Sequence, residues 1–116
     1  MKKNMIYWIP AYIVAVIIFY FSSLSYPLGE GAGPGFSDWM LHIMEYTVFS
    51  FTVYFAFLKD DRFENKKMST LLFILLFAVS DEVHQLFVPG RVGGSLFDIS
   101  MDFIGGVFVT MFSFII

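Results

Sequence analysis

Long apolar segments alternate along the chain with short polar or glycine-rich breaks. The apolar segments cover residues 5–24, 37–58, 68–88 and 95–116. Each has about the 20 residues that a helix needs to cross a bilayer. A segment in lipid must satisfy its own backbone hydrogen bonds, so the pattern predicts four transmembrane helices and an all-α fold.

The composition supports a membrane environment. The 116 residues are 58% hydrophobic and 15% charged, whereas soluble domains carry about 25% charged residues and a chain this short buries only part of its surface. We therefore predict one integral membrane domain over residues 1–116. The chain has no cysteine, which excludes disulfides and thiol nucleophiles. It has no clustered basic face either, so no nucleic acid is expected as a partner.

The basic residues predict the orientation of the bundle. In a four-pass arrangement one side of the membrane receives six of them, Lys2, Lys3, Lys59, Arg62, Lys66 and Lys67, whereas Arg91 alone falls on the other. Lysine and arginine are retained on the cytoplasmic side. Both termini are therefore predicted to be cytoplasmic and Arg91 to face outward, in a multi-pass protein of the cell membrane.

Six acidic residues and both histidines, His42 and His84, gather at the predicted outer end of the bundle. Asp38, His42 and Glu45 share one face of the second segment because their spacings are four and three. The end of the third segment and the start of the fourth contribute Asp81, Glu82, Gln85, Asp98 and Asp102. We expect these side chains to converge on one polar site.

Depth separates these residues into two groups. In each of the last three predicted helices, about 13 residues, or roughly 20 Å of helix, separate the acidic residues from the cytoplasmic end. The hydrocarbon core of a bilayer is about 30 Å thick. At least Glu45, Asp81, Glu82 and Asp102 should therefore lie below the outer surface. A charge facing lipid at that depth would cost a few kcal/mol, so these four side chains should point inward.

Structural roles remain open beside functional ones. Asp38 and Asp98 could cap their helices, and His42 could be a core histidine bonded to a carbonyl. The deeper acids could form a polar network that only fixes helix packing. Gly105 and Gly106 are expected to permit close contact between two helices.

The motifs of the last three segments resemble the VanZ-like family. They are Ser37-Asp38-x3-His42-x2-Glu45-Tyr46, then Asp81-Glu82-x2-Gln85-x-Phe87-Val88-Pro89-Gly90-Arg91, and finally Asp98-x3-Asp102-x2-Gly105. The family often has Asn at the position of Asp102, so the role of that acid is not implied by the resemblance. The founding member is associated with resistance to the glycopeptide teicoplanin, which implies an antibiotic-resistance role in the bacterial cell envelope but no particular reaction.

Three functions fit this outward site. The favoured one is binding of a glycopeptide, a lipid-linked cell-wall precursor or a lipid head group, by the residues Asp38, His42, Glu45, Asp81, Glu82, Gln85, Arg91, Asp98 and Asp102. The second is an intramembrane enzyme acting on a lipid-linked substrate, with His42, Glu45 or Glu82 as acid or base. The third is a small proton-coupled transporter, which would need oligomerisation to form a conduit.

No cofactor is predicted, because no spacing in the chain is a recognised metal motif. A divalent metal on Asp98, Asp102, Glu82 and His42 is kept as an alternative, since carboxylates and imidazole are suitable ligands.

Overall fold

The computed structural model describes residues 5–23, 38–88 and 96–112. Within them the chain forms a short 3₁₀ helix, η1 (Ile6–Trp8), and four α-helices: α2 (Ile9–Ser22), α3 (Asp38–Leu58), α4 (Lys66–Gln85) and α5 (Leu96–Met111). No strand occurs in these ranges. The predicted all-α class with four helices is therefore confirmed.

The helix boundaries differ from the predicted segments for local reasons. Helix α4 begins two residues earlier than predicted because the side chain of Asn65 caps it, accepting a hydrogen bond from the Met68 amide at 3.0 Å. It ends at Gln85, and the residues that follow form a turn in which the Val88 N–H donates to the Gln85 carbonyl. Pro10 lies in the first turn of α2, where its missing N–H costs nothing.

None of the described helices combines the length and the apolar character needed to cross a membrane. The prediction of four transmembrane helices is therefore not confirmed. Helices α2 and α5 have only 14 and 16 residues, against about 20 for a span. Helix α4 is longer, but it has Lys66 and Lys67 at one end and Asp81 and Glu82 near the other.

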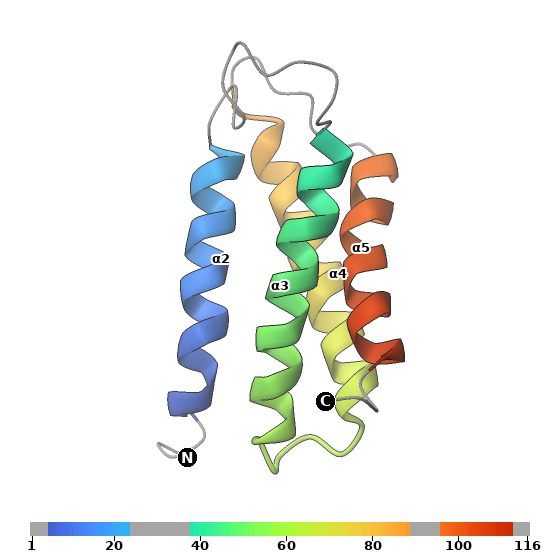
Figure 1. Cartoon of the computed structure of the whole chain (residues 1–116). Helices are drawn as coiled ribbons and strands as arrows, with labels where there is room; N and C mark the ends of the chain where they lie inside the picture. Colours follow the sequence, from blue (N-terminus) through green and yellow to red (C-terminus); the bar gives the residue numbers. More distant parts are fainter. Residues whose placement is uncertain (1–4, 24–37, 89–95, 113–116) are drawn as a thin grey trace.

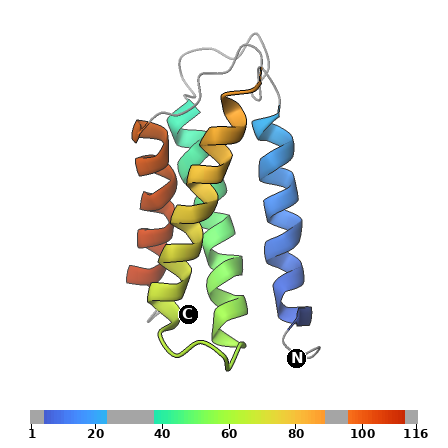
Figure 2. The same ribbon diagram turned by 180° about the vertical axis from the view of Figure 1, so that it is seen from behind.

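The four helices run side by side as an up-and-down bundle (Figure 1). Helix α5 packs against both α3 and α4, whereas α2 packs chiefly against α3. The view from behind shows α2 at the edge of the bundle, beside α3 and α4 and far from α5 (Figure 2). The start of α2, the connection after α3 and the end of α5 lie at one end of the bundle, and the start of α3, the end of α4 and the start of α5 lie at the other.

Aromatic rings fill the space between α2, α3 and α4. Phe49 lies 4.6 Å from Phe77 between ring centroids, and Trp8 lies 4.8 Å from Phe57 in an edge-on contact. Fully buried Val53 and Ile74 belong to the same core. The buried side chains of His42, Glu82 and Asp102 lie toward the end of the bundle where α3 and α5 begin and α4 ends.

Candidate functional site

Three helices each contribute one side chain to a compact group, which we call the acid–histidine triad: His42 of α3, Glu82 of α4 and Asp102 of α5. One nitrogen or oxygen atom from each residue lies within 4.8 Å of the other two. All three side chains are buried, with exposed fractions of 4%, 1% and 0%. The predicted convergence of the second, third and fourth segments is therefore seen for these three residues.

The closest contact within the triad joins His42 to Asp102. His42 Nδ1 lies 2.6 Å from Asp102 Oδ1. A carboxylate can only accept, so the ring donates through Nδ1–H. This bond fixes the orientation of the imidazole.

Glu82 brings a second carboxyl group close to Asp102. Two carboxylates at this range in a low-dielectric interior repel one another, so the pair favours either a shared proton or a bound cation. The imidazole beside them can carry a single positive charge. Chemically, the triad can therefore hold a proton, hydrogen-bond a polar ligand or bind a metal ion.

Asp81 precedes Glu82 in the chain but faces a different neighbour. Successive residues of a helix point about 100° apart, and Tyr46 Oη of α3 donates to Asp81 Oδ2 at 3.1 Å. Both residues are buried. Gln85, one turn after Asp81, is 1% exposed, and its Oε1 accepts no hydrogen bond within the described part of the chain.

The structure does not assign the remaining predicted site residues to the triad. Glu45 is half-buried on α3 and is not among the three grouped residues. Asp38 begins α3 and Asp98 lies in the first turn of α5, but their side chains fall outside what the structure describes. Arg91 also lies outside the described residues.

A glycine sets the approach of the helices just below the triad. A Cβ atom on Gly105 of α5 would lie 2.8 Å from Thr47 N and 2.9 Å from the carbonyl carbon of Tyr46, both on α3. Helix α5 thus meets the backbone of α3 directly, one turn after Asp102. The predicted close contact at Gly105 is confirmed.

Asp60, at the opposite end of the bundle, is a buried acid that the sequence did not single out. Its carboxylate accepts from Arg62 Nε at 2.9 Å and Nη2 at 2.6 Å, and from Trp8 Nε1 at 3.3 Å. The hydrogen bonds from Arg62 hold the pKa of Asp60 well below its usual value. Asp60 lies in a strongly charged loop segment, and nothing in that pattern distinguishes it from exposed Asp61. One of its donors, Trp8, lies 52 residues earlier in the chain.

Comparison with known proteins identifies the family. A family model described as VanZ/LLP1 matches residues 7–116, a range that includes every helix carrying the triad. No curated protein and no solved structure matches the chain. Because the family model covers nearly the whole sequence, the chain belongs to the VanZ/LLP1 family.

Proposed function

We propose that this VanZ/LLP1 protein is a multi-pass membrane protein of the bacterial cell envelope that binds the polar part of a lipid-linked cell-wall precursor at the triad end of its bundle. The observation that carries this proposal is the buried polar layer, in which His42, Glu82 and Asp102 come from three different helices. A site assembled in this way at the end of an apolar bundle suits a ligand with a polar head and a hydrocarbon tail.

The outer surface of the bundle supports a membrane location. Helices α2 and α4 expose large apolar side chains over most of their length, including Ile9, Tyr12, Ile13, Val16, Ile17, Tyr20, Leu72, Leu75, Leu76 and Val79. Soluble monomers rarely expose continuous apolar patches of this kind. The excess of lysine and arginine at the end opposite the triad favours a cytoplasmic location for both termini and an outward-facing triad.

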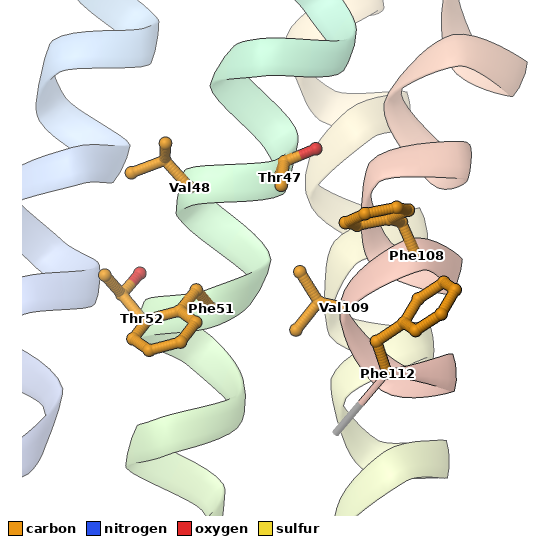
Figure 3. Close-up of a pocket in the computed structure, with 7 residues that line it drawn as sticks. All are labelled: Thr47, Val48, Phe51, Thr52, Phe108, Val109 and Phe112. Carbon is orange, nitrogen blue, oxygen red and sulfur yellow. The ribbon is translucent and has the colours of Figure 1, made fainter. Parts of the chain in front are cut away.

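An apolar groove on the outside of the bundle supports the lipid-linked character of the ligand. It lies between α3 and α5, has a volume of about 530 Å³ and is lined by Thr47, Val48, Phe51, Thr52, Phe108, Val109 and Phe112 (Figure 3). Thr47, the first residue of α3 that lines the groove, follows His42 by five residues. The groove therefore starts about 7 Å along α3 from the level of His42. A hydrocarbon chain lying in this groove would place its head group near the polar layer.

Arg91 is the residue that we expect to recognise an anionic head. It follows Gln85 by six residues and is the one basic residue on the outer side of the proposed arrangement, apart from any protonated histidine. Its planar guanidinium can donate two parallel hydrogen bonds to a phosphate or carboxylate, which a lysine cannot do.

The proposal is tested by photo-crosslinking in vesicles that contain a lipid-linked precursor with a photoactivatable group. The wild type should be labelled, and unlabelled precursor should compete. Arg91→Lys and Asp102→Asn should reduce labelling by about tenfold or more, equivalent to the loss of a charge-assisted hydrogen bond, whereas Asp61→Asn at the opposite end should not. Equal labelling of all four proteins would overturn the proposal. Teicoplanin tolerance of cells expressing the same variants gives a second readout.

One observation favours an intramembrane enzyme as a second candidate. The bond between His42 Nδ1 and Asp102 has the arrangement in which a carboxylate orients an imidazole to act as a general base through Nε2. In that case His42→Gln should abolish conversion of the lipid-linked substrate while crosslinking persists. Unchanged substrate in the presence of the wild type would exclude this candidate.

A further inference from the structure

We propose that the acid–histidine triad is a binding site for a divalent transition-metal ion, with His42, Glu82 and Asp102 as its ligands. One donor atom from each residue lies within 4.8 Å of the others. A tetrahedral metal with bonds of about 2.0–2.2 Å holds its ligand atoms roughly 3.3–3.6 Å apart. Small side-chain rotations would therefore close the three groups around one ion.

Burial is the first reason to expect an ion here rather than a purely structural cluster. Glu82 and Asp102 are 1% and 0% exposed, and charged groups in a protein interior are either paired or bound to metals. His42, 2.6 Å from Asp102, adds a nitrogen donor beside the two carboxyl groups. A divalent ion would neutralise the pair together, and it is small enough for a buried position.

Gln85 supplies a second, independent observation. Its side chain is 1% exposed and lies one turn after Glu82 on the same face of α4. The amide oxygen accepts no hydrogen bond from the described residues, although buried polar atoms nearly always have a partner. An amide oxygen at this position is suited to ligate an ion directly or to accept a hydrogen bond from an ion-bound water.

The donor set indicates which metals to expect. Imidazole nitrogen is a good ligand for zinc and other late first-row ions, and carboxylates are shared by zinc and manganese, whereas calcium and magnesium prefer oxygen alone. We therefore expect Zn²⁺ or Mn²⁺ to bind better than Mg²⁺ or Ca²⁺. Three protein ligands leave a coordination position for water or for an oxygen of another molecule.

Such an ion would change the charge of the polar layer. Asp81, Glu82 and Asp102 together would repel a phosphate-bearing head group if all were ionised. A divalent cation offsets two of these three charges and offers its open position to an anionic oxygen. The inference concerns the same end of the bundle as the proposed function, but metal content can be measured with no lipid ligand present, so each can fail alone.

The experiment uses the full-length, untagged protein purified in detergent, stripped with a chelator and then equilibrated with Zn²⁺ or Mn²⁺. Elemental mass spectrometry should find about one ion per chain, and adding the ion should raise the unfolding temperature. Glu82→Gln, Asp102→Asn and His42→Gln should each weaken binding by at least about tenfold. Wild type that binds no ion at micromolar concentrations would overturn the inference.

Two matched controls locate the site. Asp81→Asn removes an equally buried acid next to Glu82 and should retain the ion. The chain has two histidines, so His84→Gln leaves His42 as the one imidazole, and X-ray absorption at the zinc edge should still show a nitrogen ligand of imidazole type. This measurement leaves the triad intact, so it does not depend on whether the triad variants fold. Loss of the imidazole signal in His84→Gln, or loss of the ion in Asp81→Asn to the same extent as in Asp102→Asn, would refute the assignment.

Discussion

Gly105 of α5 lies directly against the backbone of Thr47 on α3, where a Cβ atom would come within 2.8 Å of the Thr47 nitrogen. Real Cβ atoms essentially never approach other atoms so closely, and a backbone nitrogen cannot rotate away. Gly105 is three residues after Asp102, and Thr47 is five residues after His42. The separation of the helices at this crossing therefore helps to set the distance between the imidazole and the carboxylate above it.

Gly105→Ala should force α5 away from α3. We expect it to destabilise the protein by about 1–3 kcal/mol, as overpacking of a tight core does, and to lower the unfolding temperature in detergent. Gly106→Ala is the matched control, because the nearest atoms to its added Cβ are side-chain atoms, Ile74 Cγ2 at 3.3 Å and Ser50 Oγ at 3.4 Å, which can shift. Equal losses of stability in the two variants would contradict this account of Gly105.

Tyr46→Phe should destabilise the bundle through Asp81. The substitution removes the hydroxyl that donates to Asp81 Oδ2 at 3.1 Å, in a place where both side chains are buried. Loss of a bond to a buried acid typically costs about 1–3 kcal/mol, measurable as a lower unfolding temperature. Tyr54→Phe, on the same helix and 8% exposed, has no bond to a carboxylate among the described residues and should have a smaller effect.

Asp60 should make the protein sensitive to acid. Its pKa in the folded chain is lowered by hydrogen bonds from Arg62, whereas an unfolded aspartate titrates at about 3.9. A lowered folded pKa gives stability that is fully present above the unfolded pKa and is lost as the pH falls through the folded value. Asp60→Asn should therefore be less stable than wild type at neutral pH, and the difference should shrink below about pH 4.

Unfolding temperatures of the two proteins between neutral and strongly acidic pH test this expectation. Asp61→Asn serves as the control because Asp61 is exposed. A difference between wild type and Asp60→Asn that is independent of pH would show that the carboxylate contributes by packing rather than by charge.

The proposed membrane arrangement predicts a labelling pattern in intact cells. Cysteine introduced at Gly33 or Gly93 should react with an impermeant maleimide, while cysteine at Asn65 should react only after the membrane is opened. The chain has no native cysteine, so labelling at each position is unambiguous. The reverse pattern would place the triad on the cytoplasmic side.

Much of the fold follows from residues that can be identified in the sequence. Four apolar segments predicted four helices, and the acids near three predicted helix ends indicated one cluster with Glu45, Glu82 and Asp102 at its centre. The structure groups Glu82 and Asp102 with His42 instead of Glu45. The length and apolar character of the described helices did not match the predicted spans, since α2 and α5 are short and α4 has charged residues near both ends.

The rotation of each helix about its axis could not be predicted. Asp81 and Glu82 are adjacent, and the sequence does not show that one faces Tyr46 while the other joins the triad. Glu45 shares a face with His42 by spacing, yet it is not a member of the triad. Asp60 was missed because its burial depends on Trp8, a partner distant in sequence. Such contacts depend on how whole helices pack, which local patterns do not encode.

Helix α2 is joined to the rest of the bundle by side-chain hydrogen bonds near both of its ends. Trp8 donates to Asp60 at 3.3 Å just before the helix begins, and Ser23 is bonded to His84 Nε2 at 3.0 Å just after it ends. The Ser23 hydroxyl already donates to the Phe19 carbonyl, so the His84 N–H donates to Ser23.

The two bonds lie 15 residues apart, which corresponds to about 22 Å of helix. Inserting or deleting one residue between them would turn the far end of α2 by about 100° and break one of the two bonds. The length of this helix, and not only its composition, is therefore constrained.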